Sequence, residues 1–148
     1  MKQIRRNVFE SNSSSVHTLQ ISKDGLEPSE LKLNKDGNIE VEFGEFGKNY
    51  MIYKTQYEKL QYLMSFIAYS YGYYYDYDLE DMYNNYDFCT VRDAVCEYAG
   101  ANNIVIVGET HAYIDHQSAD ECVINLWNPD EIINFVFNKF VALETDCD

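Results

Sequence analysis

Two histidines and two cysteines have the side-chain types that hold a structural metal ion. They are His17, Cys89, His116 and Cys122. Cys89 comes directly before a predicted helix cap, and Cys122 lies just inside another predicted helix start. The exposed amides at a helix N-terminus favour a thiolate, which is the form of cysteine that binds zinc. Two nitrogens and two sulfurs would complete a closed tetrahedral zinc site, which is typical of a structural role.

Other ligands and a simpler explanation remain open for these residues. His111 and Cys96 are the first substitutes if a member of the four does not bind. The sequence has no C-x-x-C pair, so its spacing does not match a zinc finger or a zinc ribbon. Buried thiols and hydrogen-bonded core histidines are also common where no metal is bound. The sequence therefore predicts a structural zinc site but leaves its ligands open.

A second arrangement of the same histidines would be catalytic. His17, Asp115 and His116 could form the open metal site of a small metal-dependent hydrolase. The serines at 13–15 lie close to His17 in the sequence, but no G-x-S-x-G turn is present to expose a nucleophile. Clusters of serine and asparagine ordinarily form turns. We keep the metal-dependent hydrolase as the alternative function.

Four helices would position these side chains, and each is predicted from the residues at its ends. They cover residues 55–69, 90–100, 118–127 and 129–139. The first opens with the capping box Thr55-Gln56-Tyr57-Glu58, and its apolar spacing predicts one buried face. The last opens with Asn128-Pro129-Asp130-Glu131, in which an asparagine cap precedes proline and two acids.

Alternating and apolar runs predict the strands, after a strand-like start to the chain. They cover residues 16–21, 39–43, 103–107, 111–116 and 140–143. Asp36-Gly37 predicts a tight hairpin turn between the segments 31–33 and 39–43, and the acidic end 144–148 is predicted to fray. The expected fold class is α+β. We expect a single domain over residues 1–148, with a mostly antiparallel sheet and three to four helices packed on it.

Residues 69–88, which we call the tyrosine–acid tract, are the segment least typical of an ordinary core. The tract holds eight of the fourteen tyrosines and five acids, with no lysine or arginine. Tyrosine offers a large flat surface with a polar tip and loses little entropy on binding, so it is common at interfaces. We predict that this segment faces a partner. The predicted contact residues are Tyr73, Tyr74, Tyr75, Asp76, Tyr77, Asp78, Glu80 and Asp81.

The net charge of −14 lies entirely in the later part of the chain. Residues 1–59 carry nine bases and nine acids, whereas residues 60–148 carry two bases and sixteen acids. Such a surface repels nucleic acid and anionic membranes and favours a basic protein as the partner. The alternative is that the charge serves only solubility.

Neither a signal peptide nor an apolar run of the ~18–20 residues that span a bilayer is visible, so we expect a cytoplasmic protein. In that compartment the four cysteines are expected to be thiols, ligands or buried apolar groups rather than disulfides. The charge asymmetry is therefore expected to act on cytoplasmic partners.

The segment 4–17, IRRNVFESNSSSVH, resembles the opening of a family of small phage and prophage proteins that begin F-E-[ST]-N-S-S-S-x-H. The segments 113–118 and 135–139 resemble two later parts of the same family. At least one phage protein of this kind is a zinc-containing anti-CRISPR inhibitor of the type II RNA-guided nuclease. The resemblance implies that His17 and His116, which lie in the matching motifs, are the best candidate zinc ligands.

The resemblance also implies a function. It is that of a non-enzymatic phage protein that binds the type II nuclease in the host cytoplasm and blocks loading of target DNA. The nuclease holds its RNA–DNA heteroduplex in a positively charged channel, for which an acidic, aromatic-rich surface could compete. A phage protein that binds another basic host target is a further alternative.

Overall fold

The computed structural model describes residues 2–4, 15–21, 30–73, 78–108, 111–115 and 122–147. Within these residues it contains eight strands and four helices. The strands are β1 (Lys2–Ile4), β2 (Ser15–Ile21), β3 (Asn38–Val41), β4 (Glu45–Phe46), β5 (Met51–Tyr53), β6 (Asn103–Ile106), β7 (Tyr113–Ile114) and β8 (Val141–Cys147). The helices are α1 (Gln56–Tyr71), α2 (Leu79–Tyr83), α3 (Tyr86–Ala99) and α4 (Pro129–Phe137). The expected α+β fold is confirmed.

The strands form one antiparallel sheet and two parallel pairs. The sheet has the order β1-β2-β8-β5, and β2 and β8 pair along their whole length, from Ser15 opposite Cys147 to Ile21 opposite Val141. The parallel pairs are β3 with β6 and β4 with β7. The expectation of a mostly antiparallel arrangement is thus met only in part. The long connection through α1, α2 and α3 allows β6 to lie parallel to β3, as a tight hairpin could not.

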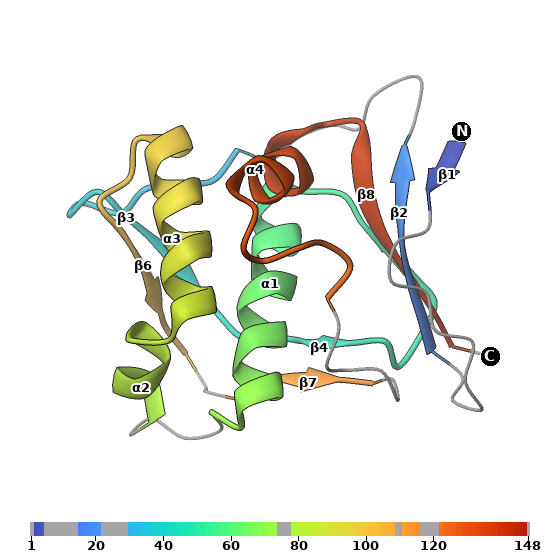
Figure 1. Cartoon of the computed structure of the whole chain (residues 1–148), viewed down its shortest axis with the longest axis horizontal. Helices are drawn as coiled ribbons and strands as arrows, with labels where there is room; N and C mark the ends of the chain where they lie inside the picture. The colour runs from blue at the N-terminus through green and yellow to red at the C-terminus, as the bar shows by residue number, and fades with distance from the viewer. Residues whose placement is uncertain are drawn as a thin grey trace.

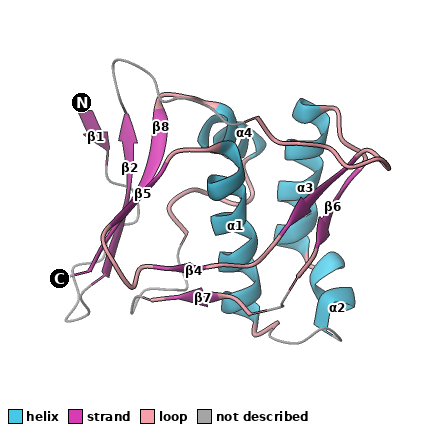
Figure 2. Cartoon of the chain, turned by 180° about the vertical axis from the view of Figure 1, so that it is seen from behind, coloured by secondary structure: helices cyan, strands magenta, loops and turns pink. Residues whose placement is uncertain are grey.

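Helix α1 lies at the centre of the fold. The antiparallel sheet stands on one side of it and α3 with β3 and β6 on the other, while α4 crosses near one end and β4 and β7 pass the opposite end (Figures 1 and 2). Every residue from Tyr62 to Ala68 is buried, and so are Lys59 and Leu60. The prediction of a single buried face was therefore wrong, because neighbours pack on the helix from several directions. None of the helices in the described ranges has the length and apolar content to cross a bilayer.

The predicted start and end of α1 are borne out closely. The Thr55 hydroxyl accepts from the Glu58 amide at 3.0 Å, and the Glu58 carboxylate accepts from the Thr55 amide at 3.2 Å, which completes the capping box. Gly72 ends the helix with φ 76°, in the left-handed region that glycine adopts without strain. The helix runs two residues beyond the predicted end.

The hairpin turn is present, but its strands pair differently from the prediction. Gly37 has φ 78°, and the Asn34 carboxamide oxygen accepts from the Asp36 and Asn38 amides, both at 2.9 Å. The segment 31–33 makes only one antiparallel bridge, from Leu33 to Ile39. Strand β3 instead takes β6 as its ladder partner.

Helix α3 begins four residues before the predicted Thr90. Asn85 is its cap, since its side-chain oxygen accepts from the amides of Asp87 at 2.8 Å and Phe88 at 3.2 Å. The Thr90 hydroxyl donates to the Tyr86 carbonyl within the helix at 3.0 Å, so it does not serve as a cap. The tyrosine–acid tract therefore contains a short helix, α2, and the first turn of another.

Two predictions near the C-terminus were wrong. Residues 122–127 of the predicted helix 118–127 form bends and a turn, and residues 116–121 lie outside the described part of the chain. The acidic end does not fray before Cys147, because β8 continues that far and pairs with β2. The Glu144 carboxylate accepts hydrogen bonds from the hydroxyls of Thr18 at 3.2 Å and Tyr50 at 2.8 Å, which ties this acid into the sheet.

Candidate functional site

The structure describes two side chains of the predicted zinc quartet. The Cys89 thiol lies in the first turns of α3 and donates to the Tyr83 carbonyl at 3.3 Å. Cys122 is buried, and burial raises the pKa of its thiol to about 12. The backbone of His17 lies in β2 but its side chain is outside the described atoms, and His116 is outside the described residues. Cys122 itself is not helical, so the expectation that it lies just inside a helix was wrong.

The substitute ligands do not complete a site among the described residues either. Cys96 is buried, and burial raises the pKa of its thiol. His111 is largely exposed, with Nε2 3.8 Å from a carboxylate oxygen of Glu45. No group of three or more histidine, cysteine or acidic side chains in the described ranges could hold a metal ion. The zinc site remains a prediction that depends on His17 and His116.

Removing His116 is the test of that prediction. We expect one zinc per chain by elemental analysis after exhaustive purification, and we expect His116→Ala to lose the metal together with thermal stability, because a structural metal stabilises the folded state. His111→Ala is the matched control, since His111 is exposed, and it is expected to keep both. A folded wild-type chain that carries no zinc would contradict the prediction.

The alternative hydrolase site is described only at Asp115. This residue follows β7, and its amide donates to the Phe46 carbonyl at 2.8 Å. Its carboxylate accepts from the Tyr113 hydroxyl at 3.5 Å. The side chains of His17 and His116 are outside the described atoms, so the hydrolase arrangement also stays a prediction.

Part of the tyrosine–acid tract supports the fold rather than facing outward. The Tyr83 hydroxyl accepts from the Ile106 amide of β6 at 2.9 Å, and the Tyr83 ring packs on Phe88 with centroids 5.3 Å apart. Tyr69 packs edge-on against Tyr113, with centroids 5.5 Å apart. Phe88 is fully buried. The expectation that the tract faces a partner along its whole length was therefore too broad.

Four of the eight predicted contact residues lie in the described part of the tract. Glu80 and Asp81 are exposed on α2, and Asp78 is half-buried directly before that helix. Tyr73 is half-buried, and its ring stacks on Tyr71 with centroids 5.8 Å apart and an interplanar angle of 12°. Residues 74–77, which include the other four, are outside the described residues.

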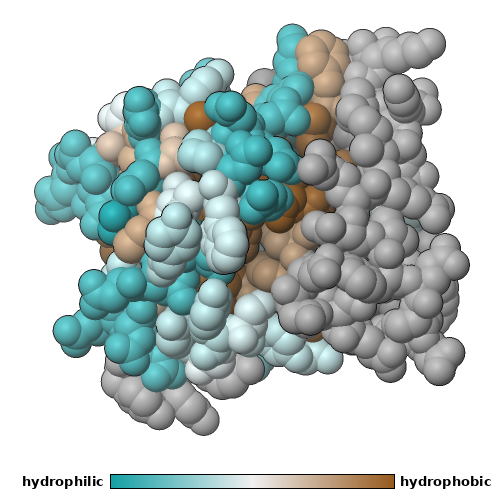
Figure 3. All heavy atoms as spheres, viewed as in Figure 1, coloured by the Kyte–Doolittle hydropathy of each residue, from teal (hydrophilic) through white to brown (hydrophobic). Residues whose placement is uncertain are grey.

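The structure brings further aromatic side chains to this region from three segments. Tyr71 comes from the end of α1, Tyr86 from the start of α3 and Trp127 from the turn before α4, and these three are 51%, 68% and 67% exposed. We call Tyr71, Tyr73, Tyr86 and Trp127 the aromatic face. Figure 3 shows the molecule from the side of Figure 1, where pale residues of intermediate hydropathy gather near the centre, between teal hydrophilic residues and a brown apolar area.

The Asp87 carboxylate connects two side chains of the aromatic face by hydrogen bonds. One carboxylate oxygen accepts from the Trp127 indole N–H at 2.5 Å, and the other accepts from the Tyr71 hydroxyl at 2.8 Å. The hydrogen bond to Asp87 raises the pKa of Tyr71, because ionising the phenol would break that bond and add a second negative charge. The Asn85 side-chain amide donates to the Tyr73 hydroxyl at 3.3 Å. The face is therefore held by a hydrogen-bond network before any partner binds.

The aromatic face lies within a strongly acidic part of the chain. Between Lys59 and Arg92 the sequence has no basic residue. Lys59 is buried, and Arg92 forms an ion pair with Asp93 at 3.0 Å. The tract itself thus contributes acids and no bases, and the two bases that border it in the sequence are already engaged.

Sequence reasoning missed Trp127 and Tyr86 as contact residues. The available signal was that Trp127 is the only tryptophan, a residue type that is enriched at protein interfaces. Tyr86 lay in the tract but was not singled out, since only the correct start of α3 places it at an exposed first turn.

Comparisons with family models, with curated proteins and with solved structures find no match to this chain. The role of the aromatic face must therefore be inferred from its own chemistry and from the resemblance of the N-terminal motif.

Proposed function

We propose that this protein is a non-enzymatic phage inhibitor that binds a type II RNA-guided nuclease of the bacterial host and blocks loading of target DNA. The observation that carries the proposal is the aromatic face, where Tyr71, Tyr86 and Trp127 are each more than half exposed in the acidic part of the chain. Exposed aromatic clusters of this kind are typical of protein interfaces. The resemblance of residues 4–17 to phage and prophage proteins suggests the partner.

The charge around the face supports a basic partner. Asp78, Glu80 and Asp81 flank the aromatic face in the sequence, and Asp87 lies beneath it. An acidic surface speeds encounter with a cationic one and repels phosphate. Direct binding of DNA by this protein is therefore disfavoured, whereas a positively charged nucleic-acid channel is attracted.

Competition with nucleic acid is the mechanism that follows from these properties. The channel that receives the heteroduplex recognises backbone charge and shape rather than sequence. Carboxylates of the tract would occupy positions that phosphates take, and the aromatic side chains would bury apolar area that phosphate cannot. The aromatic contribution should keep part of the affinity at high salt, because salt screens the charges but does not weaken apolar burial in the same way.

A gel shift with guide-loaded nuclease tests the proposal. The nuclease is first incubated with excess protein and then given labelled target DNA. We expect the shifted nuclease–DNA band to disappear. Normal DNA loading at saturating protein would overturn the proposal.

Neutralising two acids should weaken inhibition measurably. Glu80→Gln with Asp81→Asn removes two exposed carboxylates of α2 at nearly constant side-chain size, and we expect the inhibitor concentration at half effect to rise about tenfold. The matched control is Glu40→Gln with Glu42→Gln, which removes the same charge from exposed positions in the part of the chain that is neutral overall. The control is expected to change inhibition far less. If the two double variants lose inhibition equally, inhibition depends on the net charge of the protein and not on the carboxylates of α2.

A further inference from the structure

We propose that the corner between Tyr86 and Trp127, with Asp87 at its base, binds an arginine side chain of the partner protein. This proposal rests on the proposed function, in which the aromatic face and its neighbouring acids are the docking surface. It adds the chemical group that the surface recognises. The corner lies between the first turn of α3 and the turn that precedes α4.

The rings of Tyr86 and Trp127 contact each other edge to face, with their planes nearly perpendicular. Their centroids are 6.1 Å apart and the interplanar angle is 83°. Both side chains are about two-thirds exposed, at 68% for Tyr86 and 67% for Trp127. A ring face attracts a cation placed over it, and tryptophan does so most strongly.

The Asp87 carboxylate supplies the matching charge. Each of its oxygens accepts one hydrogen bond, from Trp127 and from Tyr71. A carboxylate has about four acceptor positions in total, so capacity for further donors remains. A guanidinium is flat and carries five N–H donors in its plane. It can therefore lie on a ring face and donate to the carboxylate at the same time, whereas a lysine ammonium is a compact, strongly hydrated charge.

The corner is already formed in the unbound chain. The indole N–H is bound to Asp87, and the Trp127 amide donates to the Asn125 side-chain oxygen at 2.9 Å. Tyr86 is fixed in the first turn of α3 by the Asn85 cap. Little ordering is then required on binding, which favours affinity. The acidic surroundings, with no base between residues 60 and 91, favour a basic segment as the occupant.

Intrinsic fluorescence reports on this site directly, because Trp127 is the only tryptophan in the chain. The probe is a short arginine-rich peptide, compared with a lysine peptide of equal length and charge. We expect a saturable change in Trp127 emission with the arginine peptide and about tenfold weaker binding of the lysine peptide. Equal affinity for the two peptides, or no saturable change, would overturn the proposal.

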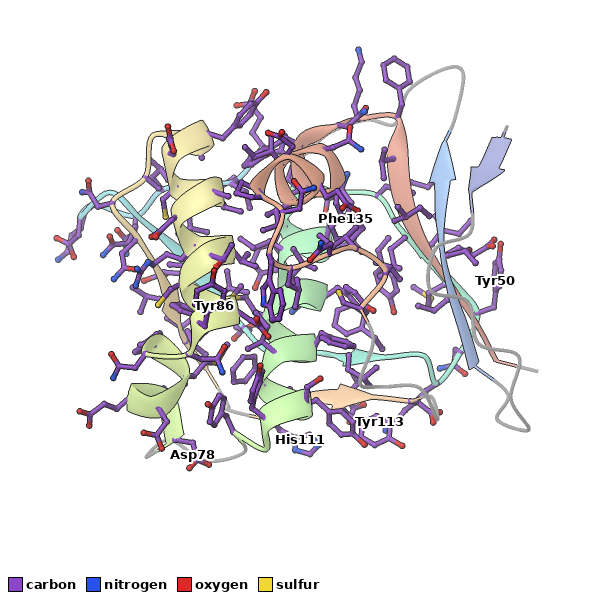
Figure 4. The ribbon with its side chains drawn as sticks, in the orientation of Figure 1. Tyr50, Asp78, Tyr86, His111, Tyr113 and Phe135 are labelled. Atoms are coloured by element: carbon purple, nitrogen blue, oxygen red, sulfur yellow. The ribbon has the colours of Figure 1, made fainter. Side chains whose placement is uncertain are left out.

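Variants at Tyr86 separate the site from general charge attraction. Tyr86→Ala is expected to weaken arginine-peptide binding about tenfold, while Tyr86→Phe keeps most of the affinity because it keeps the ring. Tyr50→Ala is the matched control, since Tyr50 is similarly exposed at 55% and lies beside the antiparallel sheet, well apart from Tyr86 (Figure 4). Circular dichroism checks that each variant is folded. Unchanged binding by folded Tyr86→Ala would contradict the site.

The two proposals can fail separately. If the arginine peptide binds as expected but nuclease still loads DNA at excess protein, the arginine site stands and the proposed function is wrong. If wild-type protein blocks DNA loading but the peptides bind equally, the proposed function stands and the arginine site is wrong.

Discussion

Phe135→Ala is expected to lower the free energy of unfolding by about 3–5 kcal/mol, the usual cost of removing a buried aromatic ring. Phe135 is fully buried on α4 (Figure 4), and its ring meets Tyr62 of α1 edge-on, with centroids 6.3 Å apart. The same ring lies 6.0 Å from the Lys59 ammonium. Its loss would leave a cavity where α4 packs on the central helix. Urea unfolding followed by circular dichroism measures the change.

Phe137→Ala is the matched control on the same helix. Phe137 is half-buried and stacks on Tyr98, with centroids 4.3 Å apart, and Tyr98 is itself 61% exposed. We expect Phe137→Ala to lower the free energy of unfolding by only about 1 kcal/mol, because much of the Phe137–Tyr98 pair is already exposed to water. Similar losses at the two positions would contradict the assignment of Phe135 as the anchor of α4.

Lys59→Met is expected to remove a rise in stability at alkaline pH. Lys59 is 1% exposed, and its ammonium donates to the backbone carbonyls of Val141 at 2.8 Å and Asn138 at 3.2 Å. Burial lowers the pKa of Lys59 to about 8. Substitution by methionine removes these hydrogen bonds, which lowers stability, and it also removes a buried charge, which raises stability. The two effects oppose each other near pH 7. The change with pH is therefore the informative quantity.

The sign of that change follows from proton binding. Above pH 8 the folded chain releases the Lys59 proton, while the unfolded chain keeps it up to the ordinary lysine pKa near 10.5. The unfolded state then binds more protons, so stability rises with pH over this window. We expect the stability difference between wild type and Lys59→Met to shift by about 2–3 kcal/mol in favour of wild type between pH 7 and pH 10.

Chemical unfolding at the two pH values checks this expectation. Comparison with the variant cancels the ionisation of tyrosines, which both chains share. Lys54→Met is the control, because Lys54 is an exposed lysine just before α1, and this variant is expected to retain the wild-type pH dependence. A difference between wild type and Lys59→Met that does not change with pH would show that Lys59 is not desolvated in the folded state.

The starts of α1 and α4 could be predicted, because their caps depend on neighbours in the sequence. The capping box at Thr55 and the asparagine–proline start at Asn128 act where they were predicted. Gly72 and Gly100 end α1 and α3 in the left-handed conformation that glycine adopts without strain. Each involves contacts across a few residues only, so the sequence contains the whole interaction.

Features that depend on distant segments could not be predicted. Strand β3 pairs with β6 rather than with its neighbour in sequence. Lys59 lies on the central helix and is buried because the backbone after α4 offers it two carbonyls. No local pattern carries this information, since the deciding contacts come from tertiary packing.

The sequence predicted which segment contains the candidate site, but it did not predict which side chains from other segments complete the aromatic face. The tract pointed to the correct region, and Tyr73 lies in the aromatic face beside Tyr71. Trp127 joins from far along the sequence through its hydrogen bond to Asp87. Composition alone could not separate Tyr83, which binds the β6 backbone, from Tyr86, which is exposed.

Hydrogen exchange of the protein with and without guide-loaded nuclease tests the central claim most directly, because it reports which backbone segments become protected. We predict that protection concentrates in the segments 71–73, 78–87 and 125–127, which surround the aromatic face. The antiparallel sheet of β1, β2, β8 and β5 should exchange as in the free protein. Protection confined to that sheet, or no change at saturating nuclease, would contradict the account.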